Sequence, residues 1–157
     1  MKKENSKKGF TIIEVVLVLA IAGLIFLMVF IALPAMQRGQ RDTQRRDDMA
    51  RVMSQLNQYQ ANNKGKIPST QAELDTFLTN YLKDGEYNDP ESGERYTTTF
   101  VTCQSGSNAC NPTLDLGTVN YMYHAECEGE TPQYVKGDRK VAIVTQLEGS
   151  GVYCSNN

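Results

Sequence analysis

The sequence predicts an α+β fold in which a long N-terminal helix packs on a small antiparallel β-sheet. Three observations predict it. Residues 15–33 form an uncharged apolar run of helical length, and residues 49–59 carry apolar side chains at helical spacing. Beyond residue 96, short segments alternate apolar with polar residues or are rich in β-branched ones. A chain of 157 residues has room for one modest domain and one membrane helix.

The apolar run is about as long as a helix that spans a bilayer. Lys7 and Lys8 precede Gly9 and Phe10, and Glu14 is the one carboxylate at the start of the run. An ionised group at the middle of such a helix costs about 2.5–3.5 kcal/mol on insertion scales. The cost falls near the interface, but a carboxylate there still favours a cationic partner. Cleavage between Gly9 and Phe10 would create one, a new amine four residues from Glu14.

This stretch resembles the processing site of type IV prepilins. The family pattern is a short basic leader that ends in Gly, followed by Phe-Thr-Leu-Ile-Glu and an apolar helix; residues 7–14 read Lys-Lys-Gly, then Phe-Thr-Ile-Ile-Glu. The resemblance implies cleavage after Gly9 by prepilin peptidase, N-methylation of Phe10, and a role for Glu14 in docking subunits into a helical filament. A secretory signal is the alternative, but its cleavage site follows a shorter apolar region of about 7–15 residues.

The resemblance also implies the partners and the location. The subunit would form a homopolymer and would need the peptidase, an assembly ATPase and a platform protein. It would begin as a single-pass precursor in the inner (cytoplasmic) membrane and end in a pilus on the cell surface. Four lysines outweigh Glu4 by three charges in the leader, so residues 10–157 carry about −5 against −2 for the whole chain. A basic leader fits the cytoplasmic side. The acidic body predicts no broad nucleic-acid surface, although nucleic-acid binding stays open.

We expect five segments along the chain. They are a cleaved leader (1–9), a transmembrane and filament-core helix (10–34), the amphipathic second half of that helix (35–65), a connecting loop with a short helix (66–95), and an antiparallel sheet with disulfides (96–157). Pro34 removes one helical hydrogen bond and clashes with the carbonyl of Phe30. Residues 30–39 should therefore kink or partly unwind, as this region does in many pilins, which makes Pro34 a candidate assembly residue. A plain kink at the membrane exit is the alternative.

Residues 37–48 are polar on all sides, with opposite charges at helical spacing. The i,i+4 pairs are Arg38–Asp42, Asp42–Arg46 and Asp47–Arg51. Each pair contributes only about 0.2–0.5 kcal/mol. This pattern predicts a solvated helix that lies against neighbouring subunits, with lipid contact as a minor role.

The amphipathic stripe begins directly afterwards. It consists of Met49, Val52, Met53, Leu56 and Tyr59, and it needs a sheet to cover. The helix should end near residues 62–65, with Gly65 as a left-handed cap. Residues 70–73 have the form of a capping box and predict a helix of about 12 residues.

An acidic, turn-rich loop follows at residues 85–96 and resembles the Asp-Pro-x-x-Gly-x-x-Tyr loop of pilins and pseudopilins. Calcium ligation by Asp84, Glu86, Asp89 and Glu91 is one reading. These residues lack EF-hand spacing, so a solvated turn without metal is the prediction.

We expect strands at residues 96–103, 119–127, 141–147 and 152–154, with the third in a central position and loops at 105–108 and 129–138. His124 falls on the polar side of its half-buried strand, which predicts an exposed residue rather than a catalytic base. Four cysteines without C-x-x-C spacing predict two disulfides in an oxidising exterior rather than a zinc site. Three pairings are possible; local geometry favours Cys103–Cys110 and Cys127–Cys154.

No residues suggest an enzyme or a cofactor site, because no nucleophile has a positioned base and no glycine-rich phosphate loop occurs. The predicted function is a structural subunit of an extracellular type IV pilus, used for motility, attachment or DNA uptake. The alternatives are a pseudopilin of a type II secretion or competence system, a minor pilin with a binding role, and a signal-anchored surface protein.

Overall fold

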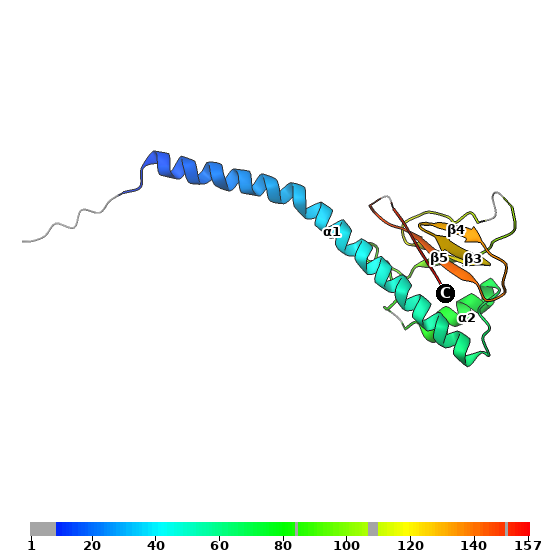
Figure 1. Ribbon diagram of the computed structural model, residues 1–157. Coiled ribbons are helices and arrows are strands. Elements are labelled where there is room, and N and C mark those ends of the chain that lie inside the picture. Colours follow the sequence, from blue (N-terminus) through cyan, green and yellow to red (C-terminus); the bar gives the residue numbers. More distant parts are fainter. Residues whose placement is uncertain (1–8, 84, 107–109, 150) are drawn as a thin grey trace, which may run out of the picture. The chain divides into compact units, whose positions relative to one another are not determined.

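A computed structural model describes residues 9–83, 85–106, 110–149 and 151–157. The described elements (Figure 1) are α1 (Ile12–Asn62), α2 (Gln71–Tyr81), β1 (Thr97–Thr102), β2 (Thr118–Tyr123), β3 (Ala125–Glu128), β4 (Thr131–Tyr134), β5 (Val141–Gln146) and β6 (Val152–Asn156). The chain divides into two compact units, Met1–Gln37 and Arg38–Asn157.

The first unit holds the apolar part of α1. Its large apolar side chains are exposed, from Phe10 and Ile12 to Met36. Among the described residues, α1 is the one helix long and apolar enough to cross a membrane. It continues through Pro34 without interruption. The partial unwinding expected at residues 30–39 is therefore absent from this single chain, because a proline removes only one hydrogen bond of the many in so long a helix.

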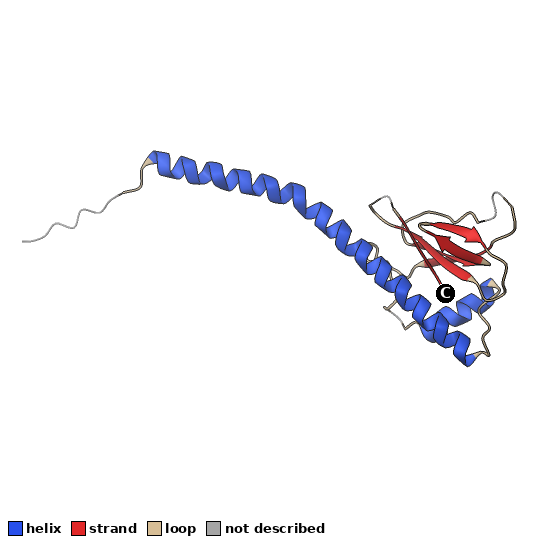
Figure 2. Ribbon diagram, in the orientation of Figure 1, coloured by secondary structure: helices blue, strands red, loops and turns tan. Residues whose placement is uncertain are grey.

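In the second unit, a four-stranded sheet has the order β1-β2-β5-β6. Strands are drawn in red in Figure 2. β5 pairs antiparallel with both of its neighbours, β2 and β6, so its predicted central position is confirmed. β1 and β2 are parallel, with Thr97 opposite Thr118. The sheet is thus mixed, and the prediction of an antiparallel sheet is wrong at this pair. The long connection between β1 and β2 lets the chain return to the same end of the sheet before β2 starts.

The predicted strand at residues 119–127 is two strands in the structure. His124 has a left-handed backbone, with φ of 63°, and separates β2 from β3. β3 then pairs with β4 in a separate two-stranded sheet, so β4 lies within the predicted loop at 129–138. The predicted half-burial of β2 is also wrong, because residues 119–122 are all buried.

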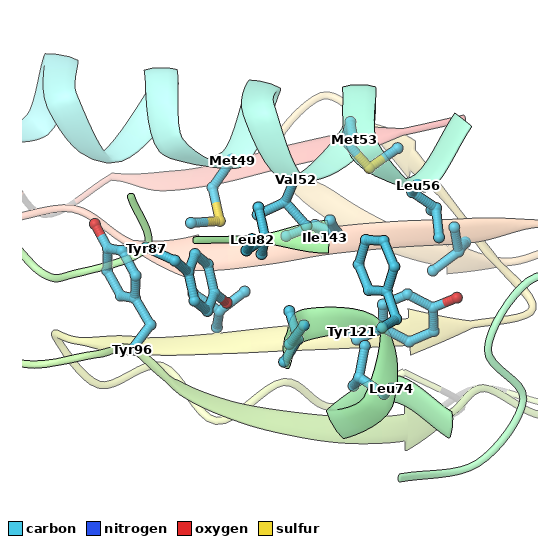
Figure 3. Close-up of a cluster of buried hydrophobic side chains, with 14 of the residues drawn as sticks. Met49, Val52, Met53, Leu56, Leu74, Leu82, Tyr87, Tyr96, Tyr121 and Ile143 are labelled. Atoms are coloured by element: carbon cyan, nitrogen blue, oxygen red, sulfur yellow. The ribbon is translucent and has the colours of Figure 1, made fainter. Parts of the chain in front are cut away.

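Burial on both faces of the main sheet explains this difference. On one face, the predicted stripe of α1 packs with α2 and the sheet, in a core that includes Met49, Leu56, Leu74, Tyr121 and Ile143 (Figure 3). Tyr59 is partly buried against the same core. A second cluster contains Cys103, Met122, Ala125, Ala142 and Val144. Because β2 contributes to both clusters, polar and apolar residues do not alternate cleanly along it.

Two short motifs end α1 and begin α2. Lys64 and Gly65 both have positive φ, and the N–H of Gly65 donates to the carbonyl of Gln60 at 2.7 Å, so the predicted left-handed cap is confirmed. Thr70 caps α2 by accepting from the N–H of Glu73 at 3.3 Å. The carboxylate of Glu73 accepts from the N–H of Ser69 at 2.8 Å. The capping box is thus formed one residue wider than the standard motif.

Candidate assembly and processing site

The Gly9–Phe10 junction lies outside the helix, because α1 begins at Ile12. The side chain of Phe10 is 91% exposed. Around Gly9, a Cβ atom would meet nothing within 4 Å. The peptide bond predicted to be cleaved is therefore in accessible, non-helical chain.

Glu14 and Thr11 form a reciprocal capping box at the start of α1. Oε2 of Glu14 accepts from the backbone N–H of Thr11 at 2.8 Å and from its hydroxyl at 2.7 Å. In return, the N–H of Glu14 lies 3.4 Å from the Thr11 hydroxyl oxygen. The carboxylate is thus satisfied within its own helix and lies at the positive end of the helix dipole. Thr11 is not among the predicted site residues, although Thr-x-x-Glu at residues 11–14 is the signal for this motif.

Arg45 is the second site, and it corrects the prediction of a solvated helix at residues 37–48. Its side chain is fully buried. Nε donates to Asp89 at 2.7 Å, and Nη1 donates to Glu148 at 2.7 Å and to Asp42 at 3.1 Å. Nη2 lies 3.5 Å from Glu91. A buried charge is tolerated only when it is paired and hydrogen-bonded, and these contacts meet that condition.

Arg41 joins the same cluster through Glu148. Its Nε and Nη2 atoms donate to the two carboxylate oxygens of Glu148 at 2.6 and 2.5 Å, a bidentate pair. The hydrogen bond from Arg41, opposed by burial and reinforced by Arg45, lowers the pKa of Glu148 to about 2. Asp42 accepts from the backbone N–H groups of Glu148 and Gly149 at 2.9 and 3.1 Å. The turn between β5 and β6 is therefore fixed to α1.

The acidic loop before β1 is attached to the same cluster. The carboxylate of Asp89 is buried and accepts from the N–H groups of Glu91 and Ser92, at 3.2 and 3.1 Å, as well as from Arg45. The loop is thus not a simple solvated turn at Asp89. Across the described part of the chain, no group of three or more acidic, histidine or cysteine residues is arranged to hold a metal ion. Asp84 lies outside the described residues.

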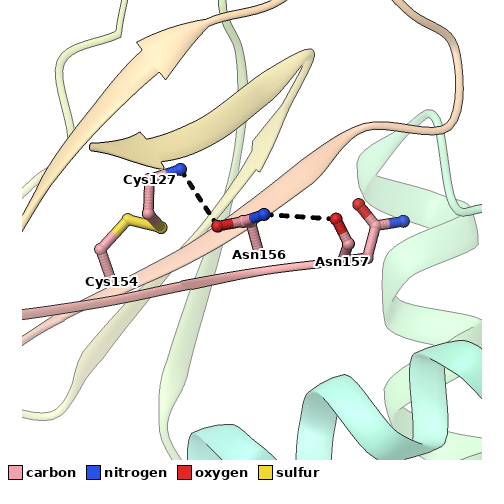
Figure 4. The surroundings of a disulfide bond; sticks show 4 residues. All are labelled: Cys127, Cys154, Asn156 and Asn157. Carbon is pink, nitrogen blue, oxygen red and sulfur yellow. Dashed lines mark hydrogen bonds between the residues drawn. A yellow bond between two sulfur atoms is a disulfide. The ribbon is translucent and has the colours of Figure 1, made fainter. Parts of the chain in front are cut away.

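The disulfides join Cys103 to Cys110 and Cys127 to Cys154, the pairing favoured from the sequence. The first closes the loop that follows β1. The second connects β3 to β6 and so links the two sheets (Figure 4). Beside it, the N–H of Cys127 donates to the side-chain oxygen of Asn156 at 3.3 Å. Both disulfides contribute to the buried cluster that contains Met122, Ala125, Ala142 and Val144.

His124 is half-buried rather than exposed, with 22% of its side chain accessible. Its ring contacts that of Tyr123 with centroids 4.0 Å apart. Nε2 lies 3.9 Å from Asp138. The turn out of β2 places the ring against this tyrosine, which the assumption of a continuous strand could not anticipate.

The family model described as the prokaryotic N-terminal methylation motif matches residues 5–30 of this chain. The match covers the Gly9–Phe10 junction, Glu14 and most of the apolar helix. Comparison with curated proteins and with solved structures gives no match. The N-terminal methylation motif marks prepilins of the type IV pilin and pseudopilin superfamily. A long helix packed against a mixed sheet is a pilin-like α+β fold, and the motif points to a structural protein rather than an enzyme.

Proposed function

We propose that this chain is a structural subunit that polymerises into an extracellular type IV pilus. One observation carries the proposal. Glu14 is a single carboxylate at the start of an apolar helix, five residues after Gly9 and directly before a run, residues 15–33, without any charge. Such a group is costly in an apolar setting unless it has a partner. Cleavage after Gly9 would supply a partner in every neighbouring subunit.

The proposed mechanism is an exchange of partners at Glu14. In the precursor, Thr11 satisfies the carboxylate. Prepilin peptidase removes residues 1–9 and methylates the new Phe10 amine, which is positively charged. Inside the helical bundle the dielectric constant is low, so an amine and a carboxylate attract each other more strongly than in water. Glu14 of an incoming subunit then pairs with Phe10 of one already in the filament.

The exposed apolar half of α1 supports the same proposal. From Phe10 to Met36 its large apolar side chains have no protein covering in the single chain. Lipid covers them before assembly, and neighbouring helices cover them afterwards, while an assembly ATPase and a platform protein drive the transfer. Pro34 lies at the end of this part, where the helix lacks one hydrogen bond. We expect residues 30–39 to loosen when the helices bundle. Motility, attachment and DNA uptake are uses of the finished fibre.

Two variants test the proposal. Replacing Gly9 with Leu should leave full-length precursor in the membrane, whereas Glu14→Ala should be processed normally but yield few fibres. Mass spectrometry of the wild-type fibre should show a chain that starts at a methylated Phe10. An intact Met1 in assembled material, or a normal fibre yield from Glu14→Ala, would contradict the proposal.

A pseudopilin of a type II secretion or competence system would share the N-terminal site and the acidic loop before β1. Electron microscopy at native expression separates the two functions, because a pilin forms long surface fibres of this protein and a pseudopilin does not. A minor pilin with a binding role would appear in such fibres in small amounts beside another major subunit.

A further inference from the structure

A groove of about 680 Å³ opens in the second unit where α1 ends. It lies between the α1–α2 connection and the loop before β5. Its lining includes Tyr59, Lys64, Lys66, Ser69, Tyr123 and Arg139. Three of these side chains are cationic, so the groove has the chemistry to receive an anionic group.

The positive charge of the groove is only partly balanced within the chain. Lys64 and Arg139 are exposed, and in the described part of the chain neither side chain has a hydrogen bond or an ion pair. Cζ of the Arg139 guanidinium lies 3.3 Å from the position that a Cβ atom of residue 65 would occupy. A larger residue at Gly65 would therefore crowd this guanidinium. Of the two carboxylates that line the groove, Glu73 already accepts from Ser69, and Asp138 stands 91% exposed.

The opposite charge gathers on the acidic turn, residues 89–94. Asp89 fixes this turn from within, through Arg45 and the N–H groups of Glu91 and Ser92. The carbonyl of Asp89 also accepts from the N–H of Gly93 at 2.8 Å. Glu94 is exposed, and the side chain of Glu91 is 52% exposed. The turn therefore presents two carboxylates on a backbone that is already ordered, which lowers the entropy cost of binding.

The acidic turn and the basic groove lie at opposite ends of the segment of α1 in this unit. The turn is attached at Arg45, and the groove begins at Lys64. Seventeen residues of helix lead from Arg45 to the end of α1 at Asn62, about 26 Å at 1.5 Å per residue. One subunit cannot bring its own two ends together. A second copy can, because a head-to-tail contact between identical chains repeats indefinitely and generates an open helical filament.

We propose that the acidic turn of one subunit, carrying Glu91 and Glu94, docks at the basic groove of a second copy of this chain, formed by Lys64, Lys66 and Arg139. This inference rests on the proposed filament and identifies the contact between its outer domains. Charges at the rim of an interface chiefly set register and rate of association. The contact thus selects which neighbour fits, while the apolar helices supply most of the cohesion.

Zero-length cross-linking of wild-type fibres with a carbodiimide tests the contact directly. Peptide mapping should find Lys64 or Lys66 joined to Glu91 or Glu94. Such a link must be between subunits, because the two ends are too far apart within one. Fibres that yield other lysine–carboxylate links but none of these would overturn the proposal.

Charge exchange supplies the second test. The groove variant, with both Lys64→Glu and Arg139→Glu, should give at least tenfold fewer fibres, although its precursor is cleaved normally. The turn variant, with both Glu91→Lys and Glu94→Lys, should have the same effect. Co-expression of the two variants should restore fibres, because opposite charges meet at every contact of a filament in which the two variants alternate. Lys83→Glu and Glu128→Lys are exposed controls outside both surfaces and should have little effect.

The outcomes separate this proposal from the function it rests on. A wild-type chain that forms no fibres contradicts the filament itself. Normal fibres from both charge-reversed variants contradict only the docking, and they leave the groove to an occupant other than a second copy.

Discussion

Nε of Arg45 and Oδ1 of Asp89 lie 2.7 Å apart, although the two residues are 44 positions apart in the sequence. The accessible fractions of the two side chains are 0% and 5%. This contact fixes the acidic loop to α1, and Glu148 brings the β5–β6 turn to the same guanidinium. One buried cation thus holds three segments of the second unit together.

We predict that Arg45→Met destabilises the second unit by about 3–5 kcal/mol, since it leaves buried carboxylates without their partner. The measurement is chemical unfolding of the detergent-solubilised chain, followed by near-ultraviolet circular dichroism. Arg46→Met is the matched control, because Arg46 is the next residue of the same helix and is exposed. Equal effects of the two substitutions would mean that the buried cluster adds nothing to stability.

The cluster should also make stability depend on pH. In the folded chain the pKa of Glu148 is about 2, against 4.5 for the free side chain. A lowered pKa adds stability that is fully present above about pH 5 and is lost as pH falls towards 2. Burial raises the pKa of Asp48, against the opposing hydrogen bond from Tyr96. A raised carboxyl pKa lowers the stability of the folded chain as pH rises, which is opposite to the effect of Glu148. In Glu148→Gln, the free energy of unfolding should therefore fall less steeply between pH 5 and pH 2 than in the wild type. Glu128→Gln, at an exposed site, should follow the wild type.

Thr11→Val should weaken assembly without blocking cleavage. Valine keeps the shape of threonine but loses the hydroxyl that donates to Glu14 at 2.7 Å, and the loss of a helix cap costs about 0.5–2 kcal/mol. We expect fewer fibres than from the wild type but more than from Glu14→Ala, with Thr11→Ser close to the wild type. Fibre mass per cell, from sheared and sedimented material, is the readout. A Thr11→Ser yield as low as that of Thr11→Val would show that the hydroxyl is not the group that matters.

The two disulfides should differ in their contributions. They close loops with sequence separations of 7 and 27 residues, and loop-closure entropy assigns them about 2.5 and 3.5 kcal/mol. Replacing both Cys127 and Cys154 by Ser should therefore lower the midpoint of thermal unfolding more than the same change at Cys103 and Cys110. The larger effect has a second reason, since only the Cys127–Cys154 bridge links the two sheets. Equal midpoints for both double variants would contradict this ranking.

Local patterns predicted much of this fold. The apolar run, the stripe beginning at Met49 and the cap at Gly65 each depend on residues within a few positions of one another, and all are present in the structure. The Thr-x-x-Glu pattern predicts the capping box at Thr70, and the same pattern at Thr11 includes Glu14 itself.

The failures share a cause, which is partners that are distant in the sequence. The polar, charged pattern of residues 37–48 predicts a solvated helix, whereas Arg45 is buried by its partners Asp89 and Glu148, which come from remote loops. The parallel pairing of β1 with β2 depends on the path of the connection between them, which carries no periodic signal. At His124, a residue other than glycine adopts a left-handed backbone, and nothing in the alternating pattern around it marks a break.

The contact between Arg45 and Glu148 also constrains the order in which this protein folds. Glu148 follows Arg45 by 103 positions and lies in the turn between β5 and β6, the last two strands of the chain. Until that turn is in place, docking this part of α1 would bury a guanidinium that lacks one of its carboxylates, which is unfavourable. The helix should therefore close onto the sheet late and in one cooperative step. A nascent or truncated chain that has not reached the β5–β6 turn would keep its helix undocked and its core open to proteases.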